Sequence, residues 1–158
     1  MKVAYLCLLS IVFVFYSTST LANPQLSKQA LNTKLFYAAK GGYVQTVKQL
    51  IEMGADVNSA QTSKETPLHA AASTGKLNVV KLLRQKGAKT DPRTSTGWIP
   101  LHHAVRFGHV QVVNHILATG TPLYLRTNSG QNVFDLAKAT KNRRMINFLE
   151  DWKRRPKR

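Results

Sequence analysis

Several short landmarks recur in this sequence at intervals of 33 residues. The segment from Thr66 to Ala72 reads TPLHAAA, and a similar segment, IPLHHAV, begins one interval later at Ile99. Weaker matches stand one interval upstream at Thr33 and one further downstream at Asn132. Two series of glycines keep the same interval: Gly42, Gly75 and Gly108, and Gly54, Gly87 and Gly120. A fixed period of this length indicates stacked repeats, each of which buries its apolar face only against its neighbours.

Within each interval the pattern predicts two helices joined by a tight turn. Proline opens the first helix at Pro67 and Pro100, because the first helical turn has no intrahelical partner for the missing N–H. An apolar stripe at helical spacing marks the second helix, and a glycine after it serves as a C-cap. The predicted helices cover residues 26–40, 44–54, 67–73, 77–85, 100–106, 110–118, 133–139 and 143–152.

These landmarks resemble the ankyrin repeat family, most closely over residues 65–89, which read ETPLHAAASTGKLNVVKLLRQKGAK. The resemblance implies an all-α solenoid of four helix-turn-helix repeats, at about 28–60, 61–93, 94–126 and 127–152, with short β-hairpin-like loops. It also implies that the histidines of the motif make structural hydrogen bonds at the helix starts. The motif residues are Thr66, Pro67, Leu68, His69, Pro100, Leu101 and His102. The sequence departs from the pattern at Lys64, where later loops have glycine, and over residues 121–124.

The two ends of the chain differ from the repeats. Residues 1–22 have the order of a cleavable signal peptide, with a positive start, an apolar run and a small residue, Ala22, at the cleavage point. We therefore expect export, either to a periplasm or by secretion, and no permanent membrane span, because the apolar run is short. The lone cysteine, Cys7, lies in this segment. Residues 153–158 form a basic tail, either an electrostatic tether or a solvated terminus.

No arrangement of side chains in the sequence predicts catalysis. The seven carboxylates are scattered, and neither a nucleophile motif nor a phosphate-binding glycine loop is present. His69 and His102 lie one repeat apart, roughly 10 Å, whereas one metal ion needs its ligands at about 2 Å. We therefore predict no enzymatic activity, no cofactor and no metal site. His115 stands where other repeats have Leu82 and Phe148, and is either a tolerated surface histidine or a partly buried, pH-sensitive one.

The surface of the third repeat is the remaining candidate for function. Ankyrin arrays bind partners with loop tips and the exposed face of the first helices, here residues 62–65, 95–98 and 128–131 with 73–74 and 106–107. This repeat combines aromatic and arginine side chains of the kind enriched at binding hot spots. The predicted partner-binding residues are Trp98, Arg106, Phe107, Arg93, Arg126 and Tyr124. The alternative is that Trp98 and Phe107 pack locally against neighbouring loops.

The charge of the chain limits the kind of partner. Lys and Arg number 23 against 7 for Asp and Glu, a formal net charge of +16, which favours acidic partners. We expect a monomeric, non-enzymatic scaffold that binds an acidic face of another protein. The alternative is a cationic binder of polyanions or of anionic membrane or cell-envelope surfaces. Salt separates the two, because contact by charge alone weakens steeply with ionic strength and does not depend on Trp98.

Overall fold

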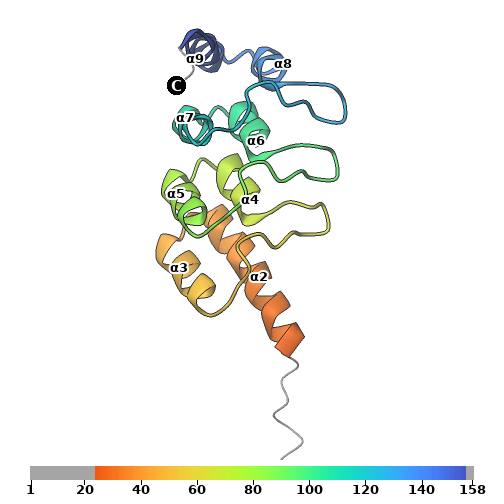
Figure 1. Cartoon of the computed structure of the whole chain (residues 1–158), viewed down its shortest axis with the longest axis vertical. Helices are drawn as coiled ribbons and strands as arrows, with labels where there is room; N and C mark the ends of the chain where they lie inside the picture. The colour runs from red at the N-terminus through yellow and green to blue at the C-terminus, as the bar shows by residue number, and fades with distance from the viewer. Residues whose placement is uncertain (1–23, 156–158) are drawn as a thin grey trace, which may run out of the picture.

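The computed structural model describes residues 24–155, with side chains from Lys28 onward, and forms eight α-helices and no β-strand there (Figure 1). The expected signal peptide and the last three residues of the basic tail lie outside the described residues. The helices are α2 (Pro24–Gly41), α3 (Val44–Glu52), α4 (Pro67–Ser73), α5 (Leu77–Gln85), α6 (Pro100–Arg106), α7 (Val110–Ala118), α8 (Val133–Ala139) and α9 (Arg143–Arg154).

The helices stack as four pairs. The first helices α2, α4, α6 and α8 form one layer, and α3, α5, α7 and α9 form a second layer beside them (Figure 1). The long connections between successive helix pairs project side by side from the same side of the array (Figure 1). The predicted all-α solenoid of four repeats is confirmed.

Local chemistry explains where the helices begin and end. Thr66 and Ile99 are extended, and the proline that follows each starts α4 and α6. Gly87 follows α5 with a φ of +86°, a conformation that only glycine adopts without strain. The bounds of α4, α5, α6, α7 and α8 agree with the prediction.

The two outermost helices are longer than predicted. α2 begins at Pro24 rather than at residue 26, because proline is tolerated in a first helical turn. α9 continues past Trp152 through Arg154. Lys153 stands one interval after Gly120, so the glycine that ends the other second helices is missing here. Two residues of the predicted tail are therefore helical. No helix within residues 24–155 is long and apolar enough to cross a bilayer.

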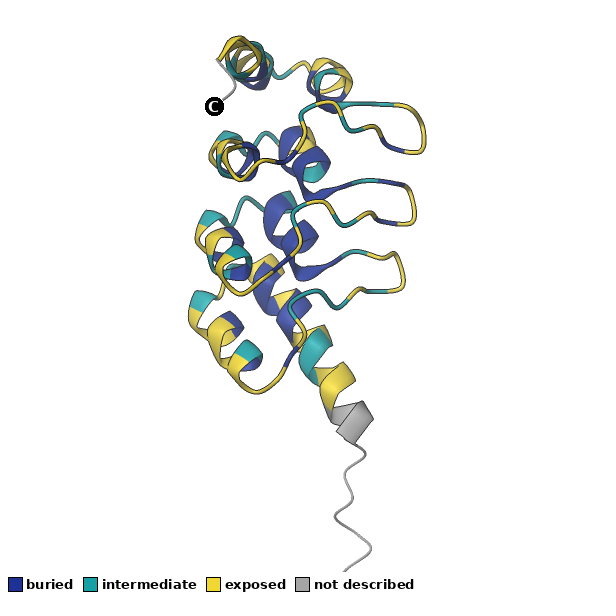
Figure 2. Cartoon of the chain, viewed as in Figure 1, coloured by how far each residue is buried: buried dark blue, intermediate teal, exposed yellow. Residues whose placement is uncertain are grey.

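The core runs through the stack as rows of equivalent residues. Leu35, Leu68 and Leu101 are fully buried between successive first helices, and each such side chain contributes about 1.5–3 kcal/mol by its burial. Phe134 ends this row and is only half-buried. Figure 2 shows the same gradient, with buried residues in the middle of the array and exposed residues on the outer sides of the helices.

Candidate functional site

The loops that carry the predicted tip residues are short hairpins with one hydrogen-bond pattern. In the third repeat, the N–H of Thr94 donates to the carbonyl of Trp98, and the N–H of Gly97 donates back to the carbonyl of Thr94. Residues 61–65 and 127–131 repeat this pattern one interval away on either side. Lys64 takes the place of Gly97 with a φ of +61°. These are the predicted hairpin-like loops, although residues 24–155 contain no assigned strand.

Neighbouring hairpins are joined to one another. The N–H of Ser95 donates to the carbonyl of Ser63, and the N–H of Asn128 donates to the carbonyl of Thr96. Arg93 reinforces the second junction, since its guanidinium donates to the carbonyls of Gly97 and Arg126 at 3.1 and 2.9 Å. Such bonds hold the loop tips in register, so that side chains from two repeats form one surface.

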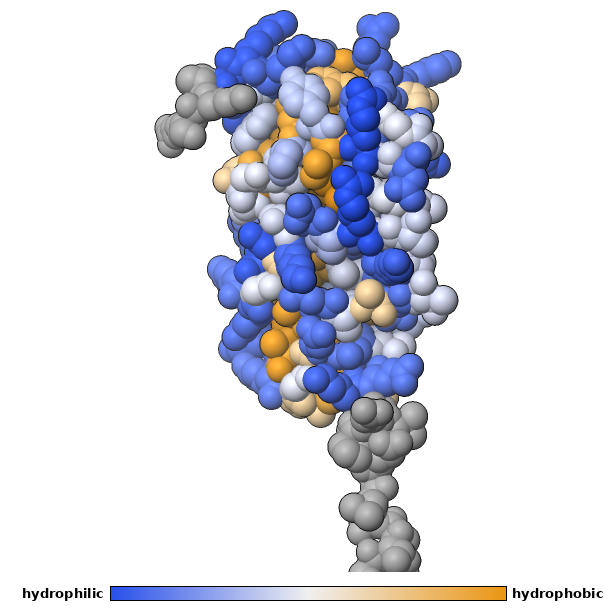
Figure 3. Space-filling view, turned by 45° about the vertical axis from the view of Figure 1, so that its right-hand side comes forward, coloured by the Kyte–Doolittle hydropathy of each residue, from blue (hydrophilic) through white to orange (hydrophobic). Residues whose placement is uncertain are grey.

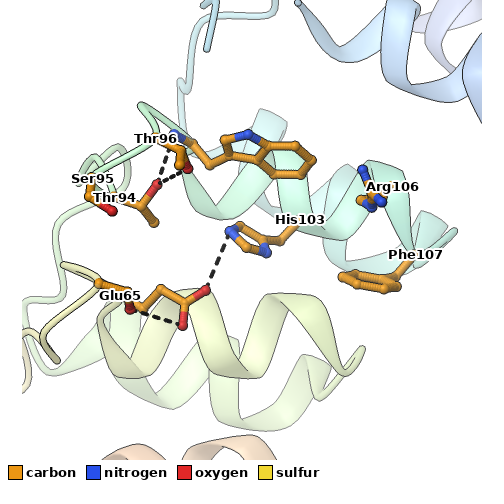
Figure 4. Close-up of a pocket in the computed structure, with 9 residues that line it drawn as sticks. Glu65, Thr94, Ser95, Thr96, His103, Arg106 and Phe107 are labelled. Atoms are coloured by element: carbon orange, nitrogen blue, oxygen red, sulfur yellow. Dashed lines mark hydrogen bonds and ion pairs between the residues drawn. The ribbon is translucent and has the colours of Figure 1, made fainter. Parts of the chain in front are cut away.

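That surface has a hollow of about 270 Å³ between the second and third repeats. The two loops line one side of the hollow, and the exposed face of α6 lines the other (Figure 4). In Figure 4, Glu65 lies below, Arg106 and Phe107 lie at the far end of α6, and the His103 ring points toward Glu65. The lining residues are Ser63, Glu65, Thr94, Ser95, Thr96, Trp98, His103, Arg106 and Phe107.

Trp98 forms the aromatic wall of this hollow. Its ring centroid lies 5.0 Å from that of His103, and the Arg106 guanidinium carbon lies 5.5 Å from the Trp98 ring. The side chain also packs against the core and is half-buried. The indole of Trp98 therefore packs locally against α6, as the alternative for this residue predicted, and the same ring still lines the hollow. Phe107 is 55% exposed.

The floor of the hollow holds a histidine and a carboxylate. The Nε2 atom of His103 lies 3.9 Å from Oε1 of Glu65, and 15% of the His103 side chain is exposed. Burial lowers the pKa of His103, while the Glu65 carboxylate partly opposes that shift. The Glu65 carboxylate also accepts a hydrogen bond from the Ser63 hydroxyl at 3.3 Å. The hollow therefore has an acidic side at Glu65 and a basic side at Arg106.

The motif histidines are structural. The backbone N–H of Thr66 donates to Nδ1 of His69 at 3.1 Å, and Nε2 of His69 bonds to the carbonyl of Trp98 at 3.2 Å. In the same way, the N–H of Ile99 donates to Nδ1 of His102, and Nε2 of His102 bonds to the carbonyl of Leu125. Each ring therefore accepts at Nδ1 and donates at Nε2, which joins the start of each first helix to the long connection that follows the helix pair and leaves neither nitrogen for a metal. Among the described residues, no group of three or more metal-binding side chains comes together.

The structure separates the predicted partner-binding residues into two groups. Trp98, Arg106 and Phe107 meet at the hollow. Arg93 and Arg126 instead have their guanidinium groups directed to loop carbonyls. Tyr124 stacks on Phe134, with ring centroids 5.9 Å apart, outside the hollow.

Sequence reasoning placed Glu65 among the loop-tip residues but did not place His103 at this surface. His103 occupies the position of the buried Ala70 and Leu136 in the neighbouring repeats, so a histidine there departs from the apolar pattern. Glu65 stands one interval before Trp98. Aligning the repeats position by position would have identified His103 as the exception beside the predicted cluster.

His115 lies outside the hollow on α7. The residue is half-buried, and its Nε2 has no hydrogen-bond partner among the described residues. Burial lowers its pKa, and Lys81 and Arg84 lower it further. Of the two alternatives for this residue, the structure therefore favours the partly buried histidine.

Comparison with known families matches residues 35–128 to a model of ankyrin repeats in three copies. Comparison with curated proteins gives no match. The matched segment covers more than half of the chain and includes both copies of the Pro-Leu-His motif together with the hairpins at 61–65 and 94–98. Members of this family are generally protein–protein interaction modules and typically non-enzymatic. The chain therefore belongs to the ankyrin repeat family.

Proposed function

We propose that the protein is a non-enzymatic scaffold that binds an acidic segment of another protein at the hollow of the third repeat. The observation that carries this proposal is the exposed ring of Phe107 beside Arg106 and Trp98, at the rim of a hollow built by two repeats. A large apolar side chain left in solvent next to a concave surface is typical of an interaction site.

The chemistry of the rim supports an apolar contact with an acidic neighbour. An apolar partner side chain can enter between the rings of Trp98 and Phe107, where removal of ring surface from water supplies the binding free energy. The guanidinium group of Arg106 is exposed at the same end, so a carboxylate next to that side chain can pair with it. Glu65 lies on the opposite side of the hollow and orients the acidic group toward Arg106.

Export belongs to the same proposal. The apolar segment at residues 3–16 and the small residue Ala22 support cleavage there and a partner outside the cytoplasm. N-terminal sequencing of the protein recovered from its source cells tests this step. We expect the mature chain to start at Asn23, and a protein recovered with Met1 would contradict export by this route.

The binding proposal is tested by affinity capture from the exported fraction of the source cells, at low and at high salt. Phe107→Ala is the informative variant, because its exposed ring can be removed with little effect on stability. Trp98→Ala is less informative, since the half-buried indole also packs on the core. We expect the wild-type chain to retain a discrete protein at high salt and Phe107→Ala to lose it.

The chain offers a matched control for this variant. Tyr124 is 56% exposed against 55% for Phe107, but it lies outside the hollow, so Tyr124→Ala should retain the captured protein. Equal loss in both variants would place the contact elsewhere. Capture of mixed acidic material at low salt only, insensitive to Phe107, would instead favour the alternative, a cationic protein that binds polyanions by charge alone.

A further inference from the structure

The C-terminal end of the array combines clustered cations with aromatic rings. Residues 138–155 include seven Lys and Arg residues and only two carboxylates, Glu150 and Asp151. Asp151 lies 3.9 Å from Arg154 in a largely exposed pair, which neutralises little at such exposure. Figure 3 shows strongly hydrophilic side chains around an apolar area at this end of the molecule.

The rings at this end lie where another repeat would otherwise stack. Phe134 continues the row of Leu68 and Leu101, which are fully buried, yet Phe134 is only half-buried. Helix α9 runs on through Lys153 instead of ending at a glycine, so the turn that leads into a following repeat is absent from the described chain. The apolar end of the core is therefore covered in part by charged side chains rather than by another helix pair.

Each of these rings already has one aromatic and one cationic neighbour. Phe134 has the Tyr124 ring stacked 5.9 Å away and the Lys153 ammonium 6.0 Å from its centroid. Trp152 has the Phe148 ring at 6.1 Å and the Arg155 guanidinium carbon at 4.5 Å. The cations and the half-buried rings thus lie together. We call this surface the terminal face; it consists of Tyr124, Phe134, Trp152, Lys153, Arg154 and Arg155.

We propose that the terminal face docks on an anionic lipid bilayer. Lysine and arginine near an anionic bilayer surface each contribute about 1 kcal/mol to binding, and tryptophan and tyrosine are the side chains that favour the headgroup region. A lipid phosphate can accept hydrogen bonds from Arg155 and Lys153 while the ring of Trp152 enters the interface beside them. The overall positive charge of the chain attracts it to such a surface.

The ring geometry favours a bilayer over a single-stranded nucleic acid. Base stacking requires open ring faces, whereas Tyr124 stacks on the Phe134 ring and the Arg155 guanidinium lies over the Trp152 ring. Interfacial insertion needs only an amphipathic ring at the depth of the headgroups. This inference does not rest on the proposed function, since the terminal face and the hollow share no residue.

The test uses the full chain with Trp98→Phe, which leaves Trp152 as the only tryptophan. The probes are phosphatidylcholine vesicles and vesicles with about 30% phosphatidylglycerol, which supply the anionic surface. We expect the emission of Trp152 to shift to shorter wavelength, and brominated lipid to quench it, with the anionic vesicles only. Because Trp152 reports its own surroundings, contact of the apolar N-terminal segment with lipid does not produce this signal. The same result with neutral vesicles would overturn the proposal.

A pair of matched variants separates the terminal face from general charge. Lys153→Gln/Arg154→Gln/Arg155→Gln should weaken binding to anionic vesicles about 100-fold, as expected for three interfacial cations. Lys28→Gln/Lys34→Gln/Lys81→Gln removes the same charge from exposed positions on α2 and α5 and should weaken it far less. Circular dichroism checks that both variants remain folded. An equal loss of vesicle binding in both triple variants would overturn the proposal. So would binding to dextran sulfate that the two triple variants weaken to the same extents as vesicle binding, if brominated lipid does not quench Trp152.

The two proposals can fail separately. Phe107→Ala should leave vesicle binding unchanged, because Phe107 belongs to the hollow and not to the terminal face. Loss of vesicle binding in Phe107→Ala would show that lipid enters through the hollow, and would overturn the assignment to the terminal face.

Discussion

His103 and Glu65 face each other across the boundary between the second and third repeats, with Nε2 of His103 3.9 Å from Oε1 of Glu65. The Nε2 atom is buried and has no hydrogen-bond partner among the described residues, and the distance to Glu65 is too long for a hydrogen bond. The pair becomes an attractive ion pair only when His103 is protonated. The charge of the hollow is therefore coupled to pH.

The first prediction concerns the pKa of His103. Burial lowers this pKa below 6.5, His102 and Arg106 lower it further, and Glu65 partly opposes them. Glu65→Gln removes the opposing charge, so the pKa of His103 should fall further. Titration of the histidine ring resonances by NMR measures this, with the His103 signal assigned by its loss in His103→Gln. An unchanged or higher pKa in Glu65→Gln would show that the carboxylate does not act on the ring.

His69 provides a second prediction, on stability in acid. Burial lowers its pKa from 6.5 to about 4, because the protonated ring is poorly solvated and Nδ1 accepts the N–H of Thr66. A histidine with a lower pKa in the folded state stabilises the fold fully above pH 6.5, and this contribution is lost as the pH falls to about 4. At 1.36 kcal/mol per pKa unit, the loss is about 3 kcal/mol.

Urea unfolding at several pH values measures this contribution in wild type and in His69→Gln, which cannot titrate. Wild type should exceed the variant in unfolding free energy near neutral pH, and the excess should shrink by about 3 kcal/mol between pH 6.5 and 4. The carboxylates and the other histidines titrate in both proteins, so their contributions to the unfolding free energy largely cancel in the difference. A difference that does not change with pH would contradict the predicted role of burial.

The bounds of helices α4 to α8 could be predicted because local residues determine them. Pro67 and Pro100 start helices whatever they pack against, and Gly87 and Gly120 end them by their positive φ. The end of α9 was harder to place, because there the glycine signal is missing. Lys153 replaces the expected glycine, and a lysine allows the helix to continue.

The candidate site was predictable only in part, because it depends on the register between loops. The sequence shows arginine at 93, 106 and 126 but not where each guanidinium points. In the structure, Arg93 reaches the carbonyl of Arg126 on the next hairpin, a contact between residues one full repeat apart. The inward orientation of Trp98 could not be predicted either, because its neighbours His103 and Arg106 belong to α6 and not to its own loop.

A third prediction concerns two lysines in a backbone conformation that favours glycine. Lys64 and Lys141 have φ values of +61° and +53°, and the equivalent positions in other repeats are glycines such as Gly97 and Gly108. The left-handed conformation strains a residue with a side chain by about 1–2 kcal/mol, while glycine adds freedom to the unfolded chain. Lys64→Gly and Lys141→Gly should each raise the free energy of unfolding by roughly 0.5–1 kcal/mol.

Chemical denaturation measures both variants against a control with the same change of residue type. Lys81 is exposed within α5, where glycine is about 1 kcal/mol less favourable than a good helix former. Lys81→Gly should therefore lower stability while the other two raise it. If all three substitutions lower stability, the positive φ values do not strain the two turns.

The last prediction separates backbone strain from steric conflict at the hairpin tips. Gly97 and Gly130 have nearly equal φ values, +77° and +79°. A Cβ atom added at Gly130 meets nothing within 4 Å, but one added at Gly97 lies 2.8 Å from the backbone nitrogen of Asn128. That nitrogen donates to the carbonyl of Thr96, and the Asn128 amide donates to the carbonyl of Ser95. The hairpins of the third and fourth repeats therefore come into contact at Gly97.

Gly130→Ala should destabilise the protein by about 1 kcal/mol through the strained φ alone. Gly97→Ala carries the same strain and must also push the two hairpins apart. Its free energy of unfolding should therefore fall by about 1–3 kcal/mol more than that of Gly130→Ala, the range for overpacked sites. Thermal and urea unfolding of the two variants give the difference directly. Because the displaced hairpin carries the wall of the hollow, Gly97→Ala should also weaken partner capture, whereas Gly130→Ala should not. Equal destabilisation by the two substitutions would mean that the hairpins are not in contact at Gly97 in solution.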